Sequence, residues 1–330
     1  MSRSSALAPL DLGTVSVWPP VMSAPMAGYT GSVYREILRE HGCPYCYTEM
    51  VSAKGLIFGG DGSREILEHG PSDRPLAVQL FGDDPEDIAR AVRIIHGSGY
   101  DFDAIDINMG CPARKVTSQG SGGALLKDLS KAADIVRAAK SATHLPVTAK
   151  TRLGWDETGS VEEIARTLAE AGLDMLAVHG RTVSQGYSGA ADWSGIYLAA
   201  SSVSIPVVGN GDIRTPQEAL SRLEGGPVSG VMVGRALLGN PTFFQDLSLL
   251  LKGKEPAEHP AEERMRLAAE HFRRAVEAYG EQRGVLDMRK QLVFYFRGIP
   301  GAARLREMLM RERSAAGVLE ILERRWREDP

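Results

Sequence analysis

The feature that most constrains how this chain can fold is a regular alternation of short apolar runs with amphipathic helical stretches. The apolar runs are rich in Val, Ile and Leu, and we assign strands to residues 21–24, 45–50, 76–80, 104–107, 147–149, 175–178, 206–208 and 230–233. Strands that alternate with helices are typical of βαβ units, which build parallel sheets. Eight such units in succession predict an α/β fold, a (β/α)8 TIM barrel.

Three of the helices between these strands begin with residues that cap helices well. They are the helices predicted over 85–96, 160–171 and 215–223, which start at Asp84, Ser160 and Thr215. Side-chain oxygens of Asp, Ser and Thr accept hydrogen bonds from the free amides of a first helical turn. These caps therefore support the alternation of strands and helices.

The pattern changes after Pro241. Residues 250–260 are polar and contain Pro and Gly, and from Ala261 onward the chain is rich in Glu, Arg, Leu and Ala. Helical periodicity without strand signals predicts a small bundle of helices. We therefore divide the chain into a catalytic barrel over 1–250 and a linker with a helical bundle over 251–330.

Polar or ionisable residues close seven of the eight predicted strands. They are Glu49, Gln79, Asn108, Lys150, His179, Asn210 and Arg235, and the turn Pro25-Met26-Ala27-Gly28 closes the first strand. In TIM-barrel enzymes the active site lies at these C-terminal strand ends. Solvation alone does not explain seven such residues in one ring, so we expect a functional cavity there.

Several of these residues suit a flavin nucleotide. Gly211 and Gly234-Arg235 follow the last two strands, where barrels commonly bind phosphate. Lys150 ends a buried strand and needs an anionic partner, such as the N1/O2 edge of a reduced flavin. The amides of Gln79 and Asn108 donate and accept, as the pyrimidine edge of a flavin or a uracil requires.

The three cysteines divide into two groups. Cys111 lies in a Gly-Cys-Pro turn at the mouth of the predicted sheet, which favours a reactive thiol over a small buried hydrophobe. Cys43 and Cys46 form a Cys-Pro-Tyr-Cys motif that suits a redox pair, half of a metal site or two structural thiols. We favour structural thiols and predict no metal site, because Cys111 is the only other cysteine and the histidines lack ligand spacing.

Eight short motifs occur in a fixed order along the chain. They are Pro25-Met26-Ala27-Gly28, Thr48-Glu49-Met50, Val78-Gln79-Leu80, Asp106-Ile107-Asn108-Met109-Gly110-Cys111-Pro112, Lys150-Thr151-Arg152-Leu153-Gly154-Trp155, His179-Gly180-Arg181-Thr182, Gly209-Asn210-Gly211-Asp212-Ile213 and Gly234-Arg235. They resemble the motifs of the FMN-dependent tRNA-dihydrouridine synthases, most closely the bacterial B-type branch. Residues 288–295 and 298–306 resemble that family's C-terminal helical domain. One departure is Tyr34-Arg35, where the family usually has Phe-Arg.

This resemblance implies a reaction and the residues that perform it. The C5–C6 double bond of specific uridines in tRNA would be reduced, with hydride passing from flavin N5 to C6 and a proton from Cys111 to C5. NADPH or NADH would be the reductant. Asn108, Arg181 and Tyr187 would face the uracil or its nucleotide. FMN would be held by Pro25, Met26, Ala27, Gln79, Lys150, His179, Asn210, Gly211, Asp212, Gly234 and Arg235.

Charge is distributed unevenly along the chain. Residues 251–330 carry 17 Lys and Arg against 14 Asp and Glu, whereas residues 1–250 carry 21 against 28. A mildly basic tail permits contact with tRNA. No stretch is apolar enough over the length that a membrane span needs, and three cysteines make no disulfide framework. We therefore expect a cytoplasmic protein without membrane association, and no obligate protein partner is evident.

Two other functions stay open at this point. An FMN-dependent reductase of a free pyrimidine or enone would share much of the ring, but it would not need residues 261–330. A non-catalytic RNA-binding protein with an inactive barrel would need neither the intact ring nor Cys111.

Overall fold

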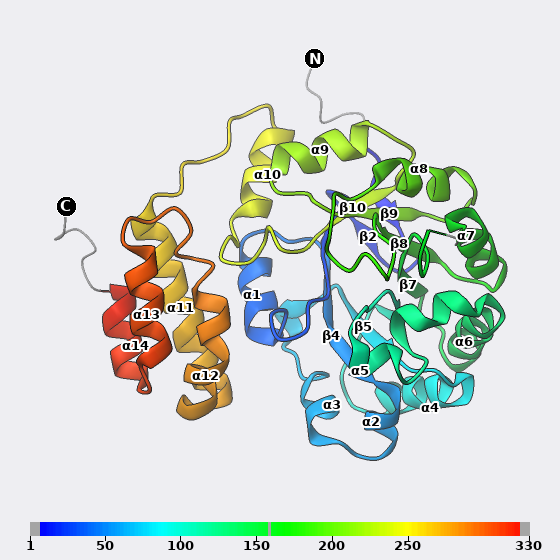
Figure 1. The fold of residues 1–330 in the computed structure, drawn as a ribbon, viewed down its shortest axis with the longest axis horizontal. Helices are drawn as coiled ribbons and strands as arrows, with labels where there is room; N and C mark the ends of the chain where they lie inside the picture. The colour runs from blue at the N-terminus through cyan, green and yellow to red at the C-terminus, as the bar shows by residue number, and fades with distance from the viewer. Residues whose placement is uncertain (1–6, 158–159, 324–330) are drawn as a thin grey trace.

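The fold is a barrel of eight parallel strands. A computed structural model describes residues 7–157 and 160–323 of the 330-residue chain. Residues 1–6 of the predicted barrel segment and 324–330 of the predicted helical segment therefore lie outside the described residues. The sheet runs from β3 through β10, β9, β8, β7, β6 and β5 to β4 (Figure 1). A hydrogen bond from Ser23 N to Tyr45 O, 3.0 Å long, joins β3 to the residue before β4 and so closes the sheet. The predicted TIM barrel is therefore confirmed.

All eight predicted strands are present, and several are longer than predicted. Their bounds are Val21–Ser23 (β3), Cys46–Ser52 (β4), Leu76–Phe81 (β5), Ala104–Met109 (β6), Val147–Arg152 (β7), Met175–His179 (β8), Val207–Asn210 (β9) and Gly230–Val233 (β10). The polar residues Asn108, Lys150 and His179 lie inside strands, because backbone pairing continues through them. Glu49 does not end its strand as expected, since β4 continues beyond a register irregularity between Tyr47 and Met50.

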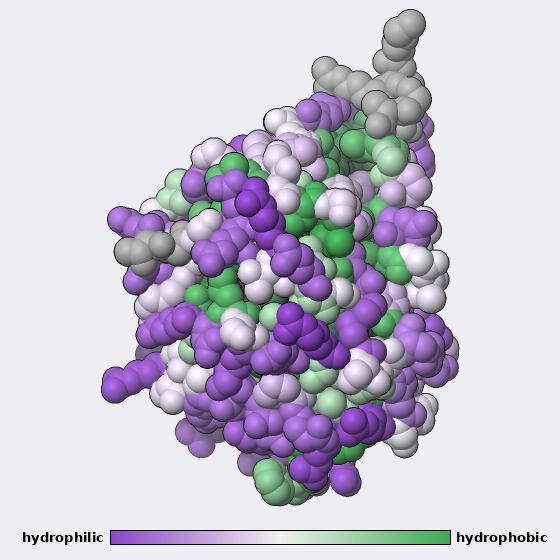
Figure 2. All heavy atoms as spheres, turned by 90° about the vertical axis from the view of Figure 1, so that its right-hand side faces the viewer, coloured by the Kyte–Doolittle hydropathy of each residue, from purple (hydrophilic) through white to green (hydrophobic). Residues whose placement is uncertain are grey.

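Helices surround the barrel on its outer face. The longer ones are Ser32–Glu40 (α1), Pro85–His96 (α4), Leu129–Ala142 (α6), Val161–Glu170 (α7), Trp193–Ser201 (α8), Pro216–Glu224 (α9) and Phe243–Leu251 (α10). Shorter segments are Ala53–Ile57 (α2), Asp61–Glu65 (α3), Arg114–Thr117 (α5) and the 3-10 turns Pro71–Asp73 (η2) and Gly122–Lys127 (η3). The face formed by the helices on the right of Figure 1 is mostly hydrophilic in Figure 2, as expected for amphipathic helices on a barrel.

The predicted helix caps are present as hydrogen bonds. The side chain of Asp84 accepts from the amides of Glu86 and Asp87. Ser160 accepts from the amide of Glu163, and Thr215 accepts from the amide of Glu218. These bonds satisfy amides that the helices themselves leave without a partner.

An N-terminal hairpin closes the amino-terminal end of the barrel. Its strands are Leu10–Asp11 (β1) and Ser16–Val17 (β2), which pair antiparallel. Leu10, Leu12, Val15 and Val17 are buried in one cluster with side chains from the barrel interior, among them Met22, Tyr45 and Met232. This end of the interior is therefore a packed core, and the cavity lies at the other end.

A separate helical region follows the barrel. It consists of Ala261–Tyr279 (α11), Glu281–Leu292 (α12), Ala302–Arg311 (α13) and Ala315–Glu323 (α14). It has its own hydrophobic cluster, which includes Met265, Phe272, Met288, Leu309 and Val318. None of the helices within residues 7–157 and 160–323 has the length and apolar character needed to cross a membrane.

The helical region packs beside α1 of the barrel (Figure 1). The ring of Tyr34 on α1 stacks on His271 of α11 with ring centroids 4.8 Å apart, and both side chains are buried. Arg274 of α11 forms an ion pair with Glu40 at 2.6 Å. These contacts anchor the helical region to the outer face of the barrel through α1.

Candidate active site

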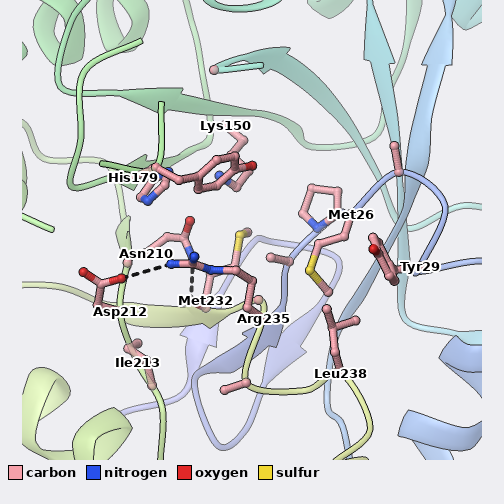
Figure 3. Close-up of a pocket in the computed structure, with 18 of the residues that line it drawn as sticks. Met26, Tyr29, Lys150, His179, Asn210, Asp212, Ile213, Met232, Arg235 and Leu238 are labelled. Atoms are coloured by element: carbon pink, nitrogen blue, oxygen red, sulfur yellow. Dashed lines mark hydrogen bonds and ion pairs between the residues drawn. The ribbon is translucent and has the colours of Figure 1, made fainter. Parts of the chain in front are cut away.

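A large cavity lies at the carboxyl-terminal ends of the barrel strands. Its volume is about 960 Å³, which is at the upper end of the range for small-molecule sites. Figure 3 shows Lys150, His179 and Asn210 on one side of it and Met26 and Tyr29 on the other. The predicted residues that line it are Pro25, Met26, Ala27, Gln79, Asn108, Cys111, Lys150, His179, Tyr187, Asn210, Gly211, Asp212, Gly234 and Arg235.

Arg181 is the predicted site residue that does not line this cavity. It is 2% exposed, and its guanidinium donates to Asp212 at 2.7 Å and to Ser188 O at 3.1 Å. A third contact, 3.3 Å long, reaches Nε2 of His179. Arg181 therefore supports the cavity wall from behind, because it orients Asp212 and His179.

His179 is a neutral imidazole in this arrangement. Burial, followed by the positive charges of Lys150, Arg152 and Arg181, lowers its pKa to about 2. A guanidinium only donates hydrogen bonds, so Nε2 of His179 is the acceptor and its proton lies on Nδ1. His179 therefore offers one N–H donor without adding charge.

Lys150 is a half-buried cation in the middle of the ring. Burial, and then the charge of Arg152, lower its pKa to about 8, although the carboxylate of Asp106 acts in the opposite direction. The ammonium is still mostly charged at pH 7. An anionic group bound beside it would favour the charged form.

The two loops after β9 and β10 form a polar corner of the cavity. Gly211 has φ +140°, and a Cβ there would lie 2.6 Å from the Cβ of Ala191. Asp212 has φ +50°, and its carboxylate accepts from Arg181 at 2.7 Å. It also accepts from Arg235 at 3.2 Å (Figure 3). Burial raises the pKa of Asp212, but the Arg181 and Ala191 hydrogen bonds outweigh it and hold the pKa below its ordinary value.

The first loop of the ring is held by contacts from two directions. Thr30 is buried, and its hydroxyl accepts from Met26 N at 2.9 Å. Gly28 has φ +77°, and its amide donates to Glu49 at 2.8 Å. A Cβ on Gly28 would lie 2.6 Å from Nζ of Lys290, at the mobile end of a long side chain, so the positive φ is what favours glycine here.

The Cys111 turn is fixed by its neighbours. The Asn108 side-chain oxygen accepts from Cys111 N at 2.9 Å and from Gly110 N at 3.2 Å. Arg152 donates to Gly110 O at 2.8 Å and to Gly186 O at 2.6 Å. The turn that carries the thiol is therefore bonded to the strand before it and to the loop that carries Tyr187.

Several lining residues were not predicted from the sequence. Met50 and Arg152 belong to the motifs that were singled out, and Arg152 lies two residues beyond Lys150 on the same strand face. Arg264, Phe294 and Arg297 come from the helical region. The guanidinium of Arg297 lies 4.6 Å from the ring centre of Phe294. Residues 251–330 were noted for their mildly basic charge, but no sequence pattern placed any of them in the cavity.

Cys43 and Cys46 lie away from this cavity. Both are buried, and their sulfur atoms are 3.6 Å apart without a disulfide. Burial raises the pKa of Cys43 well above its ordinary value. Among the described residues, no group of three or more His, Cys, Asp or Glu is arranged to hold a metal ion.

Comparisons with known proteins point to one family. The model of the family described as dihydrouridine synthase (Dus) matches residues 22–328. A probable tRNA-dihydrouridine synthase 1 from Synechocystis sp. is 36% identical over 319 residues, which are 96% of this chain and 88% of that protein. tRNA-dihydrouridine synthase B from Pseudomonas aeruginosa is 37% identical over 290 residues and 87% of each chain.

Two solved structures resemble this chain in fold. Histamine dehydrogenase from Rhizobium sp. 4-9 has a TM-score of 0.56 at 15% identity, covering 73% of this chain and 47% of that one. The amine oxidase for 6-hydroxypseudooxynicotine from Pseudomonas geniculata N1 has a TM-score of 0.58 at 13% identity, covering 79% and 52%.

Proposed function

This chain belongs to the dihydrouridine synthase family, and from that premise we propose that it reduces uridines in tRNA to dihydrouridine. The observation that carries the proposal is the cavity itself. A thiol, an ammonium and a neutral imidazole from Cys111, Lys150 and His179 line one space at the carboxyl-terminal end of the barrel. The expected substrate is a tRNA, so we expect the enzyme to act in the cytoplasm.

The residues of the cavity fit a flavin mononucleotide. The corner formed by Gly211, Gly234 and Arg235 offers backbone amides and a guanidinium whose side chain is 58% exposed, as a phosphate requires. Lys150 would lie beside the electron-rich edge of the ring system, and the charge there would keep the ammonium protonated. Met26 and Ala27 supply an apolar surface for a ring face. These residues would hold the cofactor.

Cys111 is the residue we assign to proton transfer. A bound flavin, reduced by NADPH or NADH, would supply the hydride for C6 of the uracil. Cys111 then gives its proton to C5, so that one hydride and one proton saturate the C5–C6 bond. The turn that carries the thiol is held by Asn108 and Arg152, which keeps the donor at a fixed place in the wall.

The mouth of the cavity suits a nucleotide that has left its stack. The ring of Tyr187 is 61% exposed, and the guanidinium groups of Arg152 and Arg235 each lie 5.4 Å from its centre. Exposed aromatic rings flanked by cations are platforms on which proteins stack extruded bases. Tyr187 would therefore contact the target nucleotide.

The helical region supplies positive charge to the same mouth. Burial, and then the charges of Arg235 and Arg306, lower the pKa of Arg297, because three cations share this rim. Closely spaced cations bind RNA phosphates and release counterions. We therefore propose that α13 and the segment before it hold the tRNA backbone.

Purified protein tests the proposal directly. It should carry a flavin, visible in its absorbance spectrum, and with NADPH it should form dihydrouridine in tRNA isolated from a strain that lacks this gene. Mass spectrometry of digested tRNA measures the product, and free uridine and uracil serve as controls. Reduction of free uracil but not of tRNA would make the enzyme a pyrimidine reductase instead.

A further inference from the structure

A continuous chain of hydrogen bonds links a buried carboxylate to the Cys111 turn. Gln79 Nε2 donates to Asp106 Oδ2 at 2.7 Å, and Asn108 Nδ2 donates to Gln79 Oε1 at 2.9 Å. Asn108 Oδ1 then accepts from Cys111 N at 2.9 Å. On its other oxygen, Asp106 accepts from Thr148 Oγ1 at 2.5 Å. Four side chains on three adjacent strands therefore end at the backbone of the proposed proton donor.

The carboxylate sets the direction of this chain. An ionised carboxylate only accepts hydrogen bonds, so the NH2 group of Gln79 must face Asp106. The oxygen of Gln79 must then face the NH2 group of Asn108, which leaves the oxygen of Asn108 facing the Cys111 amide. If the two amides turned over, the NH2 group of Asn108 would meet the N–H of Cys111, and two donors would oppose each other.

We propose that Asp106 is a positioning residue whose ionised carboxylate fixes this relay of amides and thereby holds the Cys111 turn in its place. Asp106 has no contact with the cavity, because it is fully buried in β6 and does not line it. It acts through Gln79 and Asn108, which do. The effect of Asp106 on catalysis depends on the proposed function. Its effect on the position of the Cys111 turn is independent of that function.

The surroundings of Asp106 are consistent with an ionised carboxylate at neutral pH. Burial raises its pKa to about 6, and the hydrogen bonds from Gln79 and Thr148 and the charge of Lys150 limit the rise. The other titratable groups that act on it are the buried phenols of Tyr45 and Tyr47, which are neutral. Lys150 is therefore the cation that balances the buried charge.

Two variants distinguish a loss of direction in the hydrogen-bond chain from the loss of any one hydrogen bond to Asp106. Asp106→Asn keeps the size but adds a donor, so residue 106 no longer forces the NH2 group of Gln79 toward it, and the direction then depends on the Gly110 and Cys111 amides alone. Thr148→Val removes the hydroxyl on the other side of the carboxylate and leaves the direction fixed. Both residues are fully buried on neighbouring strands, which makes Thr148→Val a matched control.

Amide hydrogen exchange of the flavin-free protein measures the relay without any reaction. The peptide over residues 109–113 contains the amides of Gly110 and Cys111, which both donate to Asn108. We expect the protection of these amides to fall about tenfold in Asp106→Asn, the effect of removing one hydrogen bond, and to be unchanged in Thr148→Val. Unchanged protection in Asp106→Asn, or an equal loss in both variants, overturns the proposal.

The wild-type protein provides a second test if Asp106→Asn does not fold. Protonation of Asp106 below pH 6 gives the carboxyl group a donor, so the protection of the same peptide, corrected for intrinsic exchange, should fall between pH 7 and pH 5. Constant protection over this range overturns the proposal.

The catalytic consequence is a change in kcat rather than in KM. A displaced proton donor costs about 10–100-fold in rate, so kcat for dihydrouridine formation should fall by this factor in Asp106→Asn, with the KM for tRNA unchanged. Thr148→Val should stay close to the wild type. If the wild type forms no dihydrouridine, the proposed function fails, while the exchange experiment still decides the relay.

Discussion

At the scale of single residues, the cavity combines groups whose environments change their ordinary chemistry. The pKa of His179 falls to about 2 and that of Lys150 to about 8, mainly because both are buried. Arg181, Arg152 and Arg235 add to the first of these shifts. Lys150, Arg152 and Arg235 line the cavity together with Asp212, so its wall carries an excess of positive charge, which favours anionic groups in a ligand.

The proton-donor assignment predicts a selective loss in Cys111→Ala. Dihydrouridine formation should fall about 10²–10⁴-fold, the usual cost of removing a general acid. Flavin content and NADPH oxidation should be unchanged, because the thiol lies in the turn beyond β6 rather than among the residues proposed to hold the cofactor. Cys43→Ala is the control for removal of a thiol elsewhere. A Cys111→Ala enzyme that modifies tRNA at the wild-type rate would refute the assignment.

The phosphate corner predicts that Arg235→Ala weakens flavin binding. A charge-assisted hydrogen bond contributes about 1.5–3 kcal/mol, so the Kd for FMN should rise roughly 10–100-fold. Fluorescence titration of the flavin-free protein measures the change. Arg222→Ala, whose guanidinium lies over Trp193 on the outer side of the barrel, is the control. Equal affinity in the two variants would contradict a phosphate at Arg235.

Asp106 predicts a pH-dependent contribution to stability. Its pKa is about 6 in the folded protein and close to 3.8 in the unfolded chain. Between these values the folded state binds the proton and the unfolded state does not. The free energy of unfolding, relative to Asp106→Asn, is therefore highest below the unfolded pKa and falls as pH rises through 6, by up to about 1.4 kcal/mol per pH unit. Urea denaturation at pH 4 to 7 measures it, and a difference that is constant with pH would contradict the shift.

At the scale of elements, the sequence predicted what local pattern controls. The eight strands and the caps at Asp84, Ser160 and Thr215 follow from apolar runs and from side chains that bond their own helix. The hairpin of β1 and β2 was missed, because strands of two residues carry no measurable periodicity. The strand ends were placed too early where polar residues pair as regularly as apolar ones, as Lys150 does with Asn108.

The buried hydroxyl of Tyr34 on α1, whose ring stacks on the helical region, predicts the effect of Tyr34→Phe. The Tyr34 hydroxyl donates to Leu237 O in a fully buried place, and Phe would leave that carbonyl without this donor. We expect the free energy of unfolding to fall by about 1–2 kcal/mol. Tyr197→Phe is the matched control, because its hydroxyl donates to Arg222 O at the surface. Equal midpoints of urea denaturation for the two variants would contradict the buried role.

At the scale of the whole molecule, the ring of strand-end residues was predictable and the opposite wall of the cavity was not. A parallel barrel brings all carboxyl-terminal strand ends together whatever the loops do, so Lys150, Asn210 and Arg235 had to meet. The place of Phe294 and Arg297 depends on how α11 packs on α1, through contacts such as Tyr34 with His271. Contacts between segments more than 200 residues apart leave no local pattern in a single sequence.

The proposed tRNA grip predicts a change in salt dependence. Lys290 lies against Gly28 in the first loop of the ring, so its removal would also disturb the cavity. A variant that leaves the cavity intact is Arg304→Gln with Arg306→Gln, because both residues are exposed on α13. It tests the tRNA contact more cleanly than removal of Lys290. tRNA affinity should fall, and the slope of log K against log salt should decrease by about 0.7–0.9 for each phosphate that the variant no longer neutralises.

The control for this double variant is Arg90→Gln with Arg93→Gln on α4, at the other side of the barrel (Figure 1). Flavin content should be unchanged in both. An unaltered slope for the α13 variant would move the RNA contact to the rim of the barrel.

Part of the cavity wall comes from the helical region, through Arg264, Phe294 and Arg297. The barrel and the helical region therefore evolve under a shared constraint. A chimera of this barrel with the helical region of a relative would also acquire part of the cavity wall from that relative. Under the proposed function, exchanging the helical region would therefore also alter the cavity at the strand ends. Changes in the two parts must be selected together, as they are at an interface between obligate subunits.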